Sequence, residues 1–164
     1  MTQIVGLIGY PITHSISPVF QQAAFDHCSI NVSYRKWPTS EEHLQASIER
    51  LRGDDYLGAN VTIPYKEMIA ELVDEVDEVA NRLGAVNTII KEGTRLVGRN
   101  TDEYGFMRSL RDKAMFDTKD KTIVLLGAGG AARAAAFGLI QAGVGNLTIA
   151  NRSQERLERL VNEL

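Results

Sequence analysis

Short apolar runs alternate with longer amphipathic stretches along this chain. The first run, from Ile4 to Gly9, leads into Tyr-Pro, which is typical of a strand that enters a loop. Comparable runs at 33–37 and 57–63 predict two further strands, and a helical pattern follows each of the three. Because strands alternate with helices, the pattern favours an α/β fold with a largely parallel sheet.

Several of the expected helices have clear starting signals. Ser17 and Pro18 suit an N-cap and the first helical position. Thr39 and Glu42 have the spacing of a capping box ahead of the next helix. We expect a further helical segment, in two pieces, over residues 64–83.

The middle of the chain predicts a hairpin and then a boundary. Residues 85–90 and 95–97 have the pattern of two strands joined by a short turn. Asp102 is expected to cap a helix over about residues 103–113. The polar connector at 117–121 then has the composition of a domain boundary.

The composition changes this picture little and excludes several functions. The chain has 164 residues, a net charge of −3, 44% hydrophobic and 24% charged residues, which is the balance of a soluble globular protein. That length allows one domain, or one domain and part of another. The mildly acidic sum leaves no basic footprint for nucleic acid or for a membrane surface. Cys28 is the single cysteine and the three histidines are scattered, so we expect neither an internal disulfide nor a metal site.

Residues 122–150 carry only one charge, on Arg133, and therefore have to be considered as a membrane span. Six glycines lie between Gly127 and Gly145, and an arginine near the centre of a spanning helix costs about 2.5–3.5 kcal/mol. A buried strand–helix–strand unit is the better interpretation. The N-terminus also lacks the charged region and cleavage site of a secretion signal, so a cytoplasmic protein is expected.

That unit contains a glycine-rich turn between a strand at 123–126 and an alanine-rich helix. From Gly127 to Ala132 the turn has the pattern G-x-G-x-x-A, in which the first glycine allows a tight turn and the second lets backbone N–H groups approach a pyrophosphate. The helix N-terminus adds the positive end of its dipole. We predict dinucleotide binding here rather than a merely tight structural turn. The expected cofactor-binding residues of the turn are Gly127, Ala128, Gly129, Gly130 and Ala131.

The end of the next strand indicates which dinucleotide is bound. Asn151, Arg152 and Ser153 follow that strand, with Arg156 one turn later. An NAD-binding protein usually has Asp or Glu at this point, which would repel a 2′-phosphate, whereas a guanidinium would pair with it and a hydroxyl would donate to it. NADP is therefore favoured over NAD. From these residues alone, an ordinary helix start with an exposed arginine stays open as the alternative.

The polar residues of the first half have structural interpretations when they are taken singly. Ser17 and Asp102 suit N-caps, and Lys66 is expected in the first turn of a helix, where a cation is electrostatically unfavourable. Asn60 and Thr62 alternate with apolar neighbours and so point to one face of a strand. They lie near its C-terminal end, which is where open α/β sheets bind ligands.

Taken together, these residues resemble the shikimate dehydrogenase family in order and spacing, over essentially the whole chain. The patterns N-V-T-x-P-x-K and N-T-D-x-x-G are highly specific for that family. The resemblance implies reversible, NADPH-dependent reduction of 3-dehydroshikimate to shikimate, on the route to chorismate and the aromatic amino acids. The matching segments are residues 15–18, 60–66, 84–88, 98–105, 127–133 and 151–153.

The resemblance also implies a role for each matching residue. Lys66 and Asp102 would form the catalytic pair, with Lys66 as the acid/base group and Asp102 as its orienter, although the residues themselves leave this division open. Ser15 and Ser17 would bind the substrate carboxylate, and the other polar groups would bind the ring hydroxyls. The implied substrate-binding residues are Ser15, Ser17, Asn60, Thr62, Lys66, Asn87 and Asp102.

The expected fold class is an N-terminal open α/β substrate-binding sheet domain followed by the first part of a Rossmann NADP-binding domain. We place the substrate-binding and catalytic domain at 1–103 and the incomplete Rossmann domain at 104–164. Family members continue further at the C-terminus, so a C-terminally truncated chain is expected. The strand at 123–126 would then have an uncovered apolar edge, which predicts oligomerisation, for instance as a homodimer, or disorder after about residue 115.

Two alternatives to the expected activity stay open. A quinate/shikimate dehydrogenase is the nearest, although Ser15 and Ser17 resemble the shikimate-preferring members and Asn151 to Ser153 favour NADP. The other is a fragment that binds a shikimate-like acid without turnover. In each case the expected partners are small molecules, with no nucleic acid and no membrane.

Overall fold

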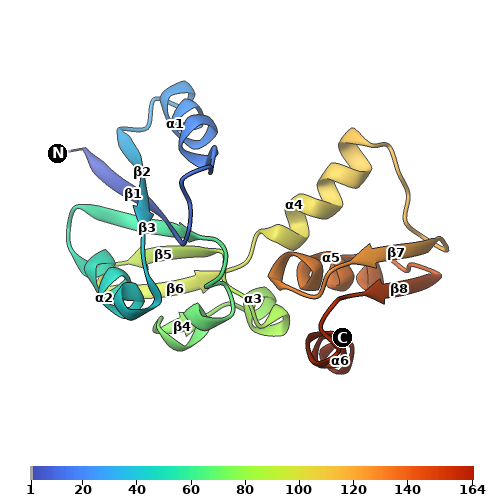
Figure 1. Cartoon of the computed structure of the whole chain (residues 1–164). Coiled ribbons are helices and arrows are strands. Elements are labelled where there is room, and N and C mark those ends of the chain that lie inside the picture. Colours follow the sequence, from blue (N-terminus) through green and yellow to red (C-terminus); the bar gives the residue numbers. More distant parts are fainter. Residues whose placement is uncertain (1) are drawn as a thin grey trace. The chain divides into compact units, whose positions relative to one another are not determined.

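The computed structural model describes residues 2–164, which form two compact units. The first unit ends at Asn100 and the second comprises Thr101–Leu164. The polar connector at 117–121 therefore lies inside the second unit. Figure 1 shows the helices and strands of each unit.

The first unit is built on one six-stranded sheet. Its strands are β1 (Gln3–Gly9), β2 (Val32–Pro38), β3 (Tyr56–Val61), β4 (Glu75–Val76), β5 (Thr88–Glu92) and β6 (Arg95–Arg99). The spatial order is β2-β1-β3-β5-β6-β4. Strands β2, β1 and β3 are parallel, β5 is antiparallel to both β3 and β6, and β4 is parallel to β6. The sheet is therefore mixed rather than largely parallel, because the predicted hairpin β5–β6 is added directly to β3.

Short helices connect these strands. They are α1 (Ser17–His27), the 3-10 turn η1 (Glu41–His43), α2 (Leu44–Glu49), η2 (Arg50–Arg52), η3 (Met68–Glu71) and α3 (Glu78–Leu83). In Figure 1, α1 and α2 lie on opposite sides of the strands β1 to β3. The helix expected after Thr39 is thus divided into η1, α2 and η2.

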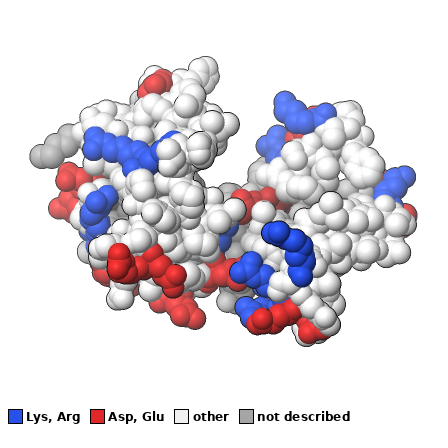
Figure 2. Space-filling model, viewed as in Figure 1, with Lys and Arg blue, Asp and Glu red and all other residues white. Residues whose placement is uncertain are grey.

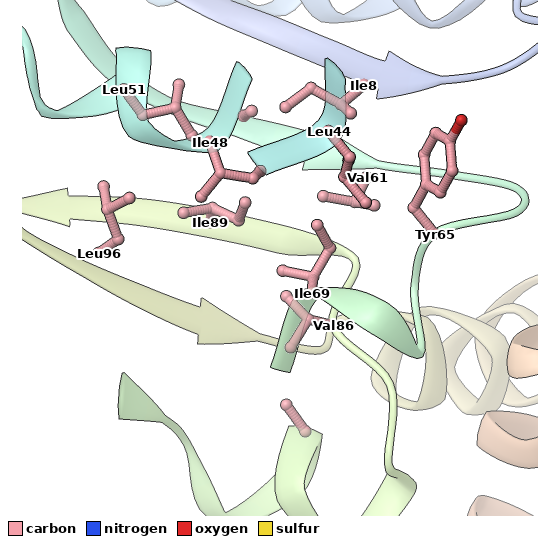
Figure 3. Close-up of a cluster of buried hydrophobic side chains, with 12 residues drawn as sticks. Ile8, Leu44, Ile48, Leu51, Val61, Tyr65, Ile69, Val86, Ile89 and Leu96 are labelled. Atoms are coloured by element: carbon pink, nitrogen blue, oxygen red, sulfur yellow. The ribbon is translucent and has the colours of Figure 1, made fainter. Parts of the chain in front are cut away.

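Alternate residues of the strands supply the cores on the two faces of the sheet. Ile8 of β1 and its neighbour Val61 of β3 point into the larger cluster, which also receives residues of α2, η3 and β5 (Figure 3). Leu7 of β1 and Tyr34 of β2 point to the other face, where α1 lies. This second face is thinly covered, since α1 has no buried residue. Asn60 of β3 and Thr88 of β5 lie on the same side as Leu7, so this face carries polar groups as well.

The helical segment expected over residues 64–83 is present as two pieces, but they cover only half of that range. Only η3 and α3 are helical, and the two residues of β4 pair with β6 instead. Asp74 explains the change, because its carboxylate accepts hydrogen bonds from the Arg52 guanidinium at 2.6 and 3.0 Å and from the backbone N–H of Leu96 at 2.7 Å. Asp77 does cap α3, and Gly84 ends it with φ of 57°.

Three expected caps are absent. α1 begins at Ser17 itself and Ile16 occupies the cap position, so the Ser17 side chain does not cap the helix. Asp102 is likewise the first residue of its helix, after Thr101. The Thr39 hydroxyl donates to the carbonyl of Trp37 rather than taking part in a capping box. The hydroxyl of Ser17 is thus not committed to the cap we expected.

The second unit has the order expected for the start of a Rossmann fold. It contains α4 (Asp102–Arg108), the π-helical turn η4 (Ser109–Lys113), β7 (Thr122–Leu126), α5 (Gly130–Gln141), β8 (Asn146–Ala150) and α6 (Gln154–Glu163). β7 and β8 are parallel neighbours, and α5 connects them. This βαβ arrangement is the element that places a phosphate at the start of its helix.

One face of the two-stranded sheet is open. The side chains of β7 and β8 alternate between half-buried and exposed, and Val124 and Leu126 of β7 are 63% and 79% exposed. α5 covers the other face and holds Arg133, whose guanidinium is buried and paired with the carboxylate of Glu163 in α6. The single charge of the apolar stretch is therefore neutralised by an ion pair between two helices.

On the face seen in Figure 2, Lys and Arg are interspersed with Asp and Glu. Within residues 2–164, no helix is long and apolar enough to span a membrane, and no group of His, Cys, Asp and Glu side chains is arranged to hold a metal ion.

Candidate active site and cofactor site

The parallel strands β1 and β3 bring several of the predicted site residues to one edge of the first sheet. Both strands end at the same edge, and the chain continues their pairing beyond it, because the N–H of Thr62 donates to the carbonyl of Ile8 at 2.9 Å. The N–H of Tyr10 donates to the carbonyl of Ile63 at 3.1 Å. The loop after β1, which carries Ser15, is thereby tied to the loop after β3.

Ser15 and Ser17 form a small hydroxyl pair at the start of α1. The Ser15 hydroxyl donates to Ser17 Oγ at 3.1 Å and accepts from the backbone N–H of Ser17 at 3.2 Å. Both residues are half-buried. Lys36 supports their loop from β2, since its ammonium donates to the carbonyl of Thr13 at 2.6 Å. The two hydroxyls are therefore held next to each other, as binding of one carboxylate requires.

Lys66 lies in a turn between β3 and η3, and not in the first turn of a helix as we expected. Its neighbour Tyr65 anchors the turn, because the Tyr65 ring is buried in the larger core (Figure 3) and its hydroxyl donates to the carbonyl of Thr39 at 2.7 Å. The carbonyl of Lys66 accepts from the N–H of Val86 at 2.7 Å. The lysine backbone is thus fixed on both sides while its side chain is half-buried.

Asn60 and Asn87 are joined by a chain of side-chain hydrogen bonds that the sequence did not indicate. Asn60 Oδ1 accepts from the hydroxyl of Tyr34 at 2.8 Å, and Asn60 Nδ2 donates to Thr88 Oγ1 at 3.2 Å. The Thr88 hydroxyl in turn donates to Asn87 Oδ1 at 2.9 Å. Asn87 lies one residue before β5 rather than within it. Burial raises the pKa of Tyr34 to about 12, so its phenol is a hydrogen-bond donor at neutral pH.

The sequence does not single out Tyr34 and Thr88, because only the pairing of strands brings them to Asn60. The register places Thr88 directly opposite Asn60 and Tyr34 two strands away on the same face. The sequence carries no local signal for them, since β2 and β5 also contain exposed or half-buried polar residues such as Arg35 and Lys91. Position along the chain gives no distance between them.

Asp102 belongs to the second unit, where it opens α4 and is half-buried. The structure therefore places the predicted catalytic pair on different units. Within the first unit, the residues brought to the edge of the sheet are Ser15, Ser17, Asn60, Thr62, Lys66 and Asn87.

The glycine-rich turn has the conformation that the pattern G-x-G-x-x-A predicts. Gly127 has φ of 116°, which is the region that favours glycine, and a Cβ there would lie 3.8 Å from the Cβ of Ala132. A Cβ on Gly129 would meet no atom within 4 Å, so its backbone faces open space. Gly129 also holds the N-cap position of α5, where no side chain covers the first N–H groups. An anion can therefore approach the start of α5 closely.

The ends of β7 and β8 border an open hollow of about 470 Å³ beside this turn. Leu126, Gly127, Ala150, Asn151 and Arg152 line it. Past the hollow, Ser153 caps α6 by accepting from the N–H of Arg156 at 3.4 Å, and Asn151 Nδ2 donates to the carbonyl of Ser153 at 2.9 Å. Arg152 and Arg156 are exposed. Arg152 thus borders the same hollow as the glycine-rich turn, and Arg156 lies in the first turn of α6, which follows it in the chain.

Two family models match the chain. The first is described as the shikimate dehydrogenase substrate binding domain and matches residues 7–89, and the second is described as shikimate / quinate 5-dehydrogenase and matches residues 109–164. Both matches are in the order in which the two units follow each other.

Individual relatives agree with the family models. A shikimate dehydrogenase (NADP(+)) of Moorella thermoacetica is 47% identical over 163 residues, which is 99% of this chain and 55% of that protein. The crystal structure of a shikimate dehydrogenase from Aquifex aeolicus has a TM-score of 0.93 and 38% identity, over 99% of this chain and 60% of that one. One from Thermus thermophilus, in complex with NADP(H) and shikimate, has a TM-score of 0.89 and 36% identity, over 98% and 60%. The chain thus spans 55–60% of the length of these relatives.

Proposed function

Because this chain belongs to the shikimate dehydrogenase family, we propose that it supplies the substrate domain and the first part of the NADP domain of an enzyme that reversibly reduces 3-dehydroshikimate to shikimate with NADPH. The observation that carries the proposal is the edge of the first sheet, where the hydroxyls of Ser15 and Ser17 and the turn of Lys66 meet the ends of β1 and β3. Neutral amides and hydroxyls suit a ring with several hydroxyls, and a cation suits its carboxylate or its reacting oxygen.

The chemistry needs one group that moves a proton. Bound NADPH would supply a hydride to the carbonyl carbon of 3-dehydroshikimate. Lys66, as the ammonium, donates a proton from Nζ to the carbonyl oxygen, so the ketone becomes an alcohol and Lys66 becomes a neutral amine. In the reverse direction the amine takes the proton back from the hydroxyl. We assign Asp102 to orienting Lys66, by a charge that holds the ammonium in place.

Substrate recognition follows from the groups at the sheet edge. The Ser17 hydroxyl is not used to cap α1, and it lies 3.1 Å from that of Ser15, so we assign both to the substrate carboxylate. We assign the ring hydroxyls to Asn60, Thr62, Asn87 and Asp102. Groups of this kind discriminate strongly, because a substrate that lacks a hydroxyl leaves a buried polar group without its partner.

The residues of the second unit fit NADP. Gly129 and the start of α5 leave backbone N–H groups open to a pyrophosphate, together with Gly127, Ala128, Gly130 and Ala131. Arg152 and Arg156 would pair with a 2′-phosphate. Asn151 and Ser153 complete this region, because the Ser153 oxygen accepts from the Arg156 N–H and its hydroxyl hydrogen can still be donated to a phosphate oxygen.

We also propose a location in the cell for the protein and a surface through which two copies associate. Small molecules are the proposed ligands of both sites, and the proposed location is the cytoplasm, where an enzyme of this biosynthetic route finds NADPH. The exposed face of β7, with Val124 and Leu126, is the surface through which two copies of the chain would associate as a homodimer.

An assay of NADPH oxidation with 3-dehydroshikimate tests the proposed reaction. It is run on this chain and on a chimera in which the C-terminal part of the Moorella thermoacetica relative follows Leu164. We expect turnover in the chimera, with NADPH strongly preferred over NADH. Absence of turnover in a folded chimera that binds NADPH would contradict the proposed function.

Two alternative outcomes of this assay have their own meaning. Comparable turnover of quinate in the reverse direction would assign the chain to a quinate/shikimate dehydrogenase, because quinate differs from shikimate at the ring and not at the carboxylate. Binding of shikimate to the 164-residue chain in calorimetry, with turnover only in the chimera, would show that this chain alone is a binding fragment.

A further inference from the structure

The hydrogen-bonded chain from Tyr34 to Asn87 has a direction. It runs from β2 through Asn60 on β3 to Thr88 at the start of β5, and each group donates to the next. Below, Tyr34, Asn60, Thr88 and Asn87 are together called the amide relay. All four belong to the first unit, and Tyr34, Asn60 and Thr88 lie on the face of the sheet that α1 covers.

Two directions are chemically self-consistent for such a relay. In one, the Tyr34 phenol donates to Asn60 Oδ1 and the relay ends on Asn87 Oδ1. In the other, both amides are turned over, Asn87 Nδ2 donates to Thr88, and Asn60 Nδ2 donates to the Tyr34 oxygen. Threonine fits both, because a hydroxyl donates one hydrogen bond and accepts others.

The burial of Tyr34 decides between these directions. The residue is 7% exposed, and its hydroxyl forms a hydrogen bond with the side chain of Asn60. If both amides were turned over, the phenolic hydrogen would be buried without an acceptor, which costs about 1–3 kcal/mol. The phenol must therefore donate, and this fixes Asn60 with its oxygen toward Tyr34 and its nitrogen toward Thr88.

The direction determines which atom of Asn87 can donate to groups outside the relay. Thr88 takes Oδ1 of Asn87, so the amide nitrogen points away from the relay. An amide nitrogen only donates, and therefore suits an oxygen that accepts. A carbonyl oxygen accepts only, and the hydroxyl and carboxylate oxygens of a shikimate-like acid can accept as well.

We propose that Tyr34 is a positioning residue for substrate recognition, which acts through Asn60 and Thr88 to turn the nitrogen of Asn87 toward an oxygen of the substrate. This inference rests on the proposed function for the identity of the substrate. Thr88 connects the two amides, because its hydroxyl accepts a hydrogen bond from Asn60 Nδ2 and donates one to Asn87 Oδ1.

The direct test observes the amides themselves. In nitrogen-15 NMR spectra of the chain, Tyr34→Phe removes the hydroxyl with little change of shape, and we expect the side-chain NH2 resonances of Asn60 and Asn87 to shift together. In a Thr88→Val background the same change should no longer reach Asn87, and Thr88→Ser should restore the coupling. Tyr56→Phe is the matched control, since Tyr56 lies at the opposite end of β3 from Asn60.

The functional test uses the chimera. Tyr34→Phe and Thr88→Val should each raise the KM for 3-dehydroshikimate about fivefold to tenfold, the effect of one neutral hydrogen bond. The KM for NADPH should not change. The double variant should be no worse than the single ones, because both break one relay, whereas two independent packing defects would add. Thr88→Ser should keep the parental KM.

The outcomes separate this proposal from the proposed function. If the chemical shift of the Asn87 side-chain NH2 group does not change in Tyr34→Phe, the relay is refuted, independently of the enzyme kinetics. A shifted resonance with an unchanged KM overturns the role in substrate recognition and leaves the dehydrogenase function standing. If the parental chimera is inactive, the proposed function fails, and shikimate binding to the Tyr34→Phe and parental chains still decides the role of Tyr34. Should Tyr34→Phe fail to fold, the Thr88 pair carries the same test.

Discussion

The backbone N–H of Val86 donates to the carbonyl oxygen of Lys66 over 2.7 Å. This bond ties the turn after β3 to the segment that leads into β5, directly beside Asn87. Tyr65 adds a second attachment through its buried hydroxyl. The lysine is therefore held by groups that do not touch its ammonium, which makes a change of its side chain a clean test of its chemistry.

We expect Lys66→Ala in the chimera to lower kcat by about 10²–10⁴-fold, the usual contribution of a positioned acid/base group. Shikimate binding should change little, because the hydroxyls and amides of the sheet edge are kept. Kinetics and calorimetry measure the two quantities separately. Lys91→Ala is the matched control, since the ammonium of Lys91 donates to the carbonyl of Gly53 at 2.7 Å, at the other end of β5. Near-normal turnover of Lys66→Ala would refute the role assigned to it.

The Asp74 carboxylate predicts a loss of stability in acid. Hydrogen bonds from Arg52 and from the backbone N–H of Leu96 lower its pKa from 3.8 to about 2. Because the pKa of the folded state lies below that of the unfolded chain, the carboxylate stabilises the fold above the unfolded pKa. That contribution is lost as pH falls through the folded pKa, in the window between about pH 4 and pH 2.

Asp74→Asn should therefore unfold at lower urea concentration at neutral pH and should show a flatter decline between about pH 4 and pH 2. Urea titrations at a series of pH values measure both effects. Glu78→Gln removes a carboxylate from an exposed pair with Arg82 and should change neither. An Asp74→Asn profile that parallels the parental one throughout the acid range would show that this pair is not a stabilising contact.

We expect Arg152 and Arg156 to determine the preference for NADPH over NADH. Removing a guanidinium that pairs with the 2′-phosphate should raise the KM for NADPH roughly 10-fold to 100-fold, the range for hydrogen bonds to charged groups. The KM for NADH should stay the same, since NADH lacks that phosphate. Arg159→Ala is the control on α6, where Arg159 pairs with Glu155. Equal losses for both cofactors in Arg152→Ala or Arg156→Ala would place the 2′-phosphate elsewhere.

The open face of β7 predicts self-association of the 164-residue chain. Val124 and Leu126 are 63% and 79% exposed on neighbouring positions of the same face. Light scattering should find species larger than a monomer, and the pair of changes Val124→Thr and Leu126→Lys should reduce them. Val161→Lys is the control, because Val161 is exposed on α6. A monomer at all concentrations, with or without these changes, would contradict the homodimer.

Local patterns were enough for the elements whose signals are contained within a few residues. β1, β2, β3 and the β5–β6 hairpin were expected at nearly their observed places, because apolar runs and turn residues stand next to each other in the sequence. The conformation of the glycine-rich turn was also predicted, since Gly127 has a φ of 116° and the turn joins a strand to a helix as its pattern indicates.

Segments whose structure depends on distant partners were predicted only in part. Residues 64–83 have a helical pattern, yet Asp74 bonds to Arg52 and to the N–H of Leu96, and β4 pairs with β6. These contacts join parts of the chain that lie far apart in sequence. Their hydrogen bonds and strand pairing outweigh the local preference for a helix.

The candidate site divides in the same way. The sequence by itself determined which residue types stand at the spacing of the family, among them Lys66, the two serines and the arginines after β8. Only the tertiary structure decided their setting, because the hydroxyl of Tyr34 meets Asn60 through strand register and the turn of Lys66 is held by a hydrogen bond from Val86. Hydrogen bonds across a sheet depend on which strands are neighbours, and that order is a property of the folded chain as a whole.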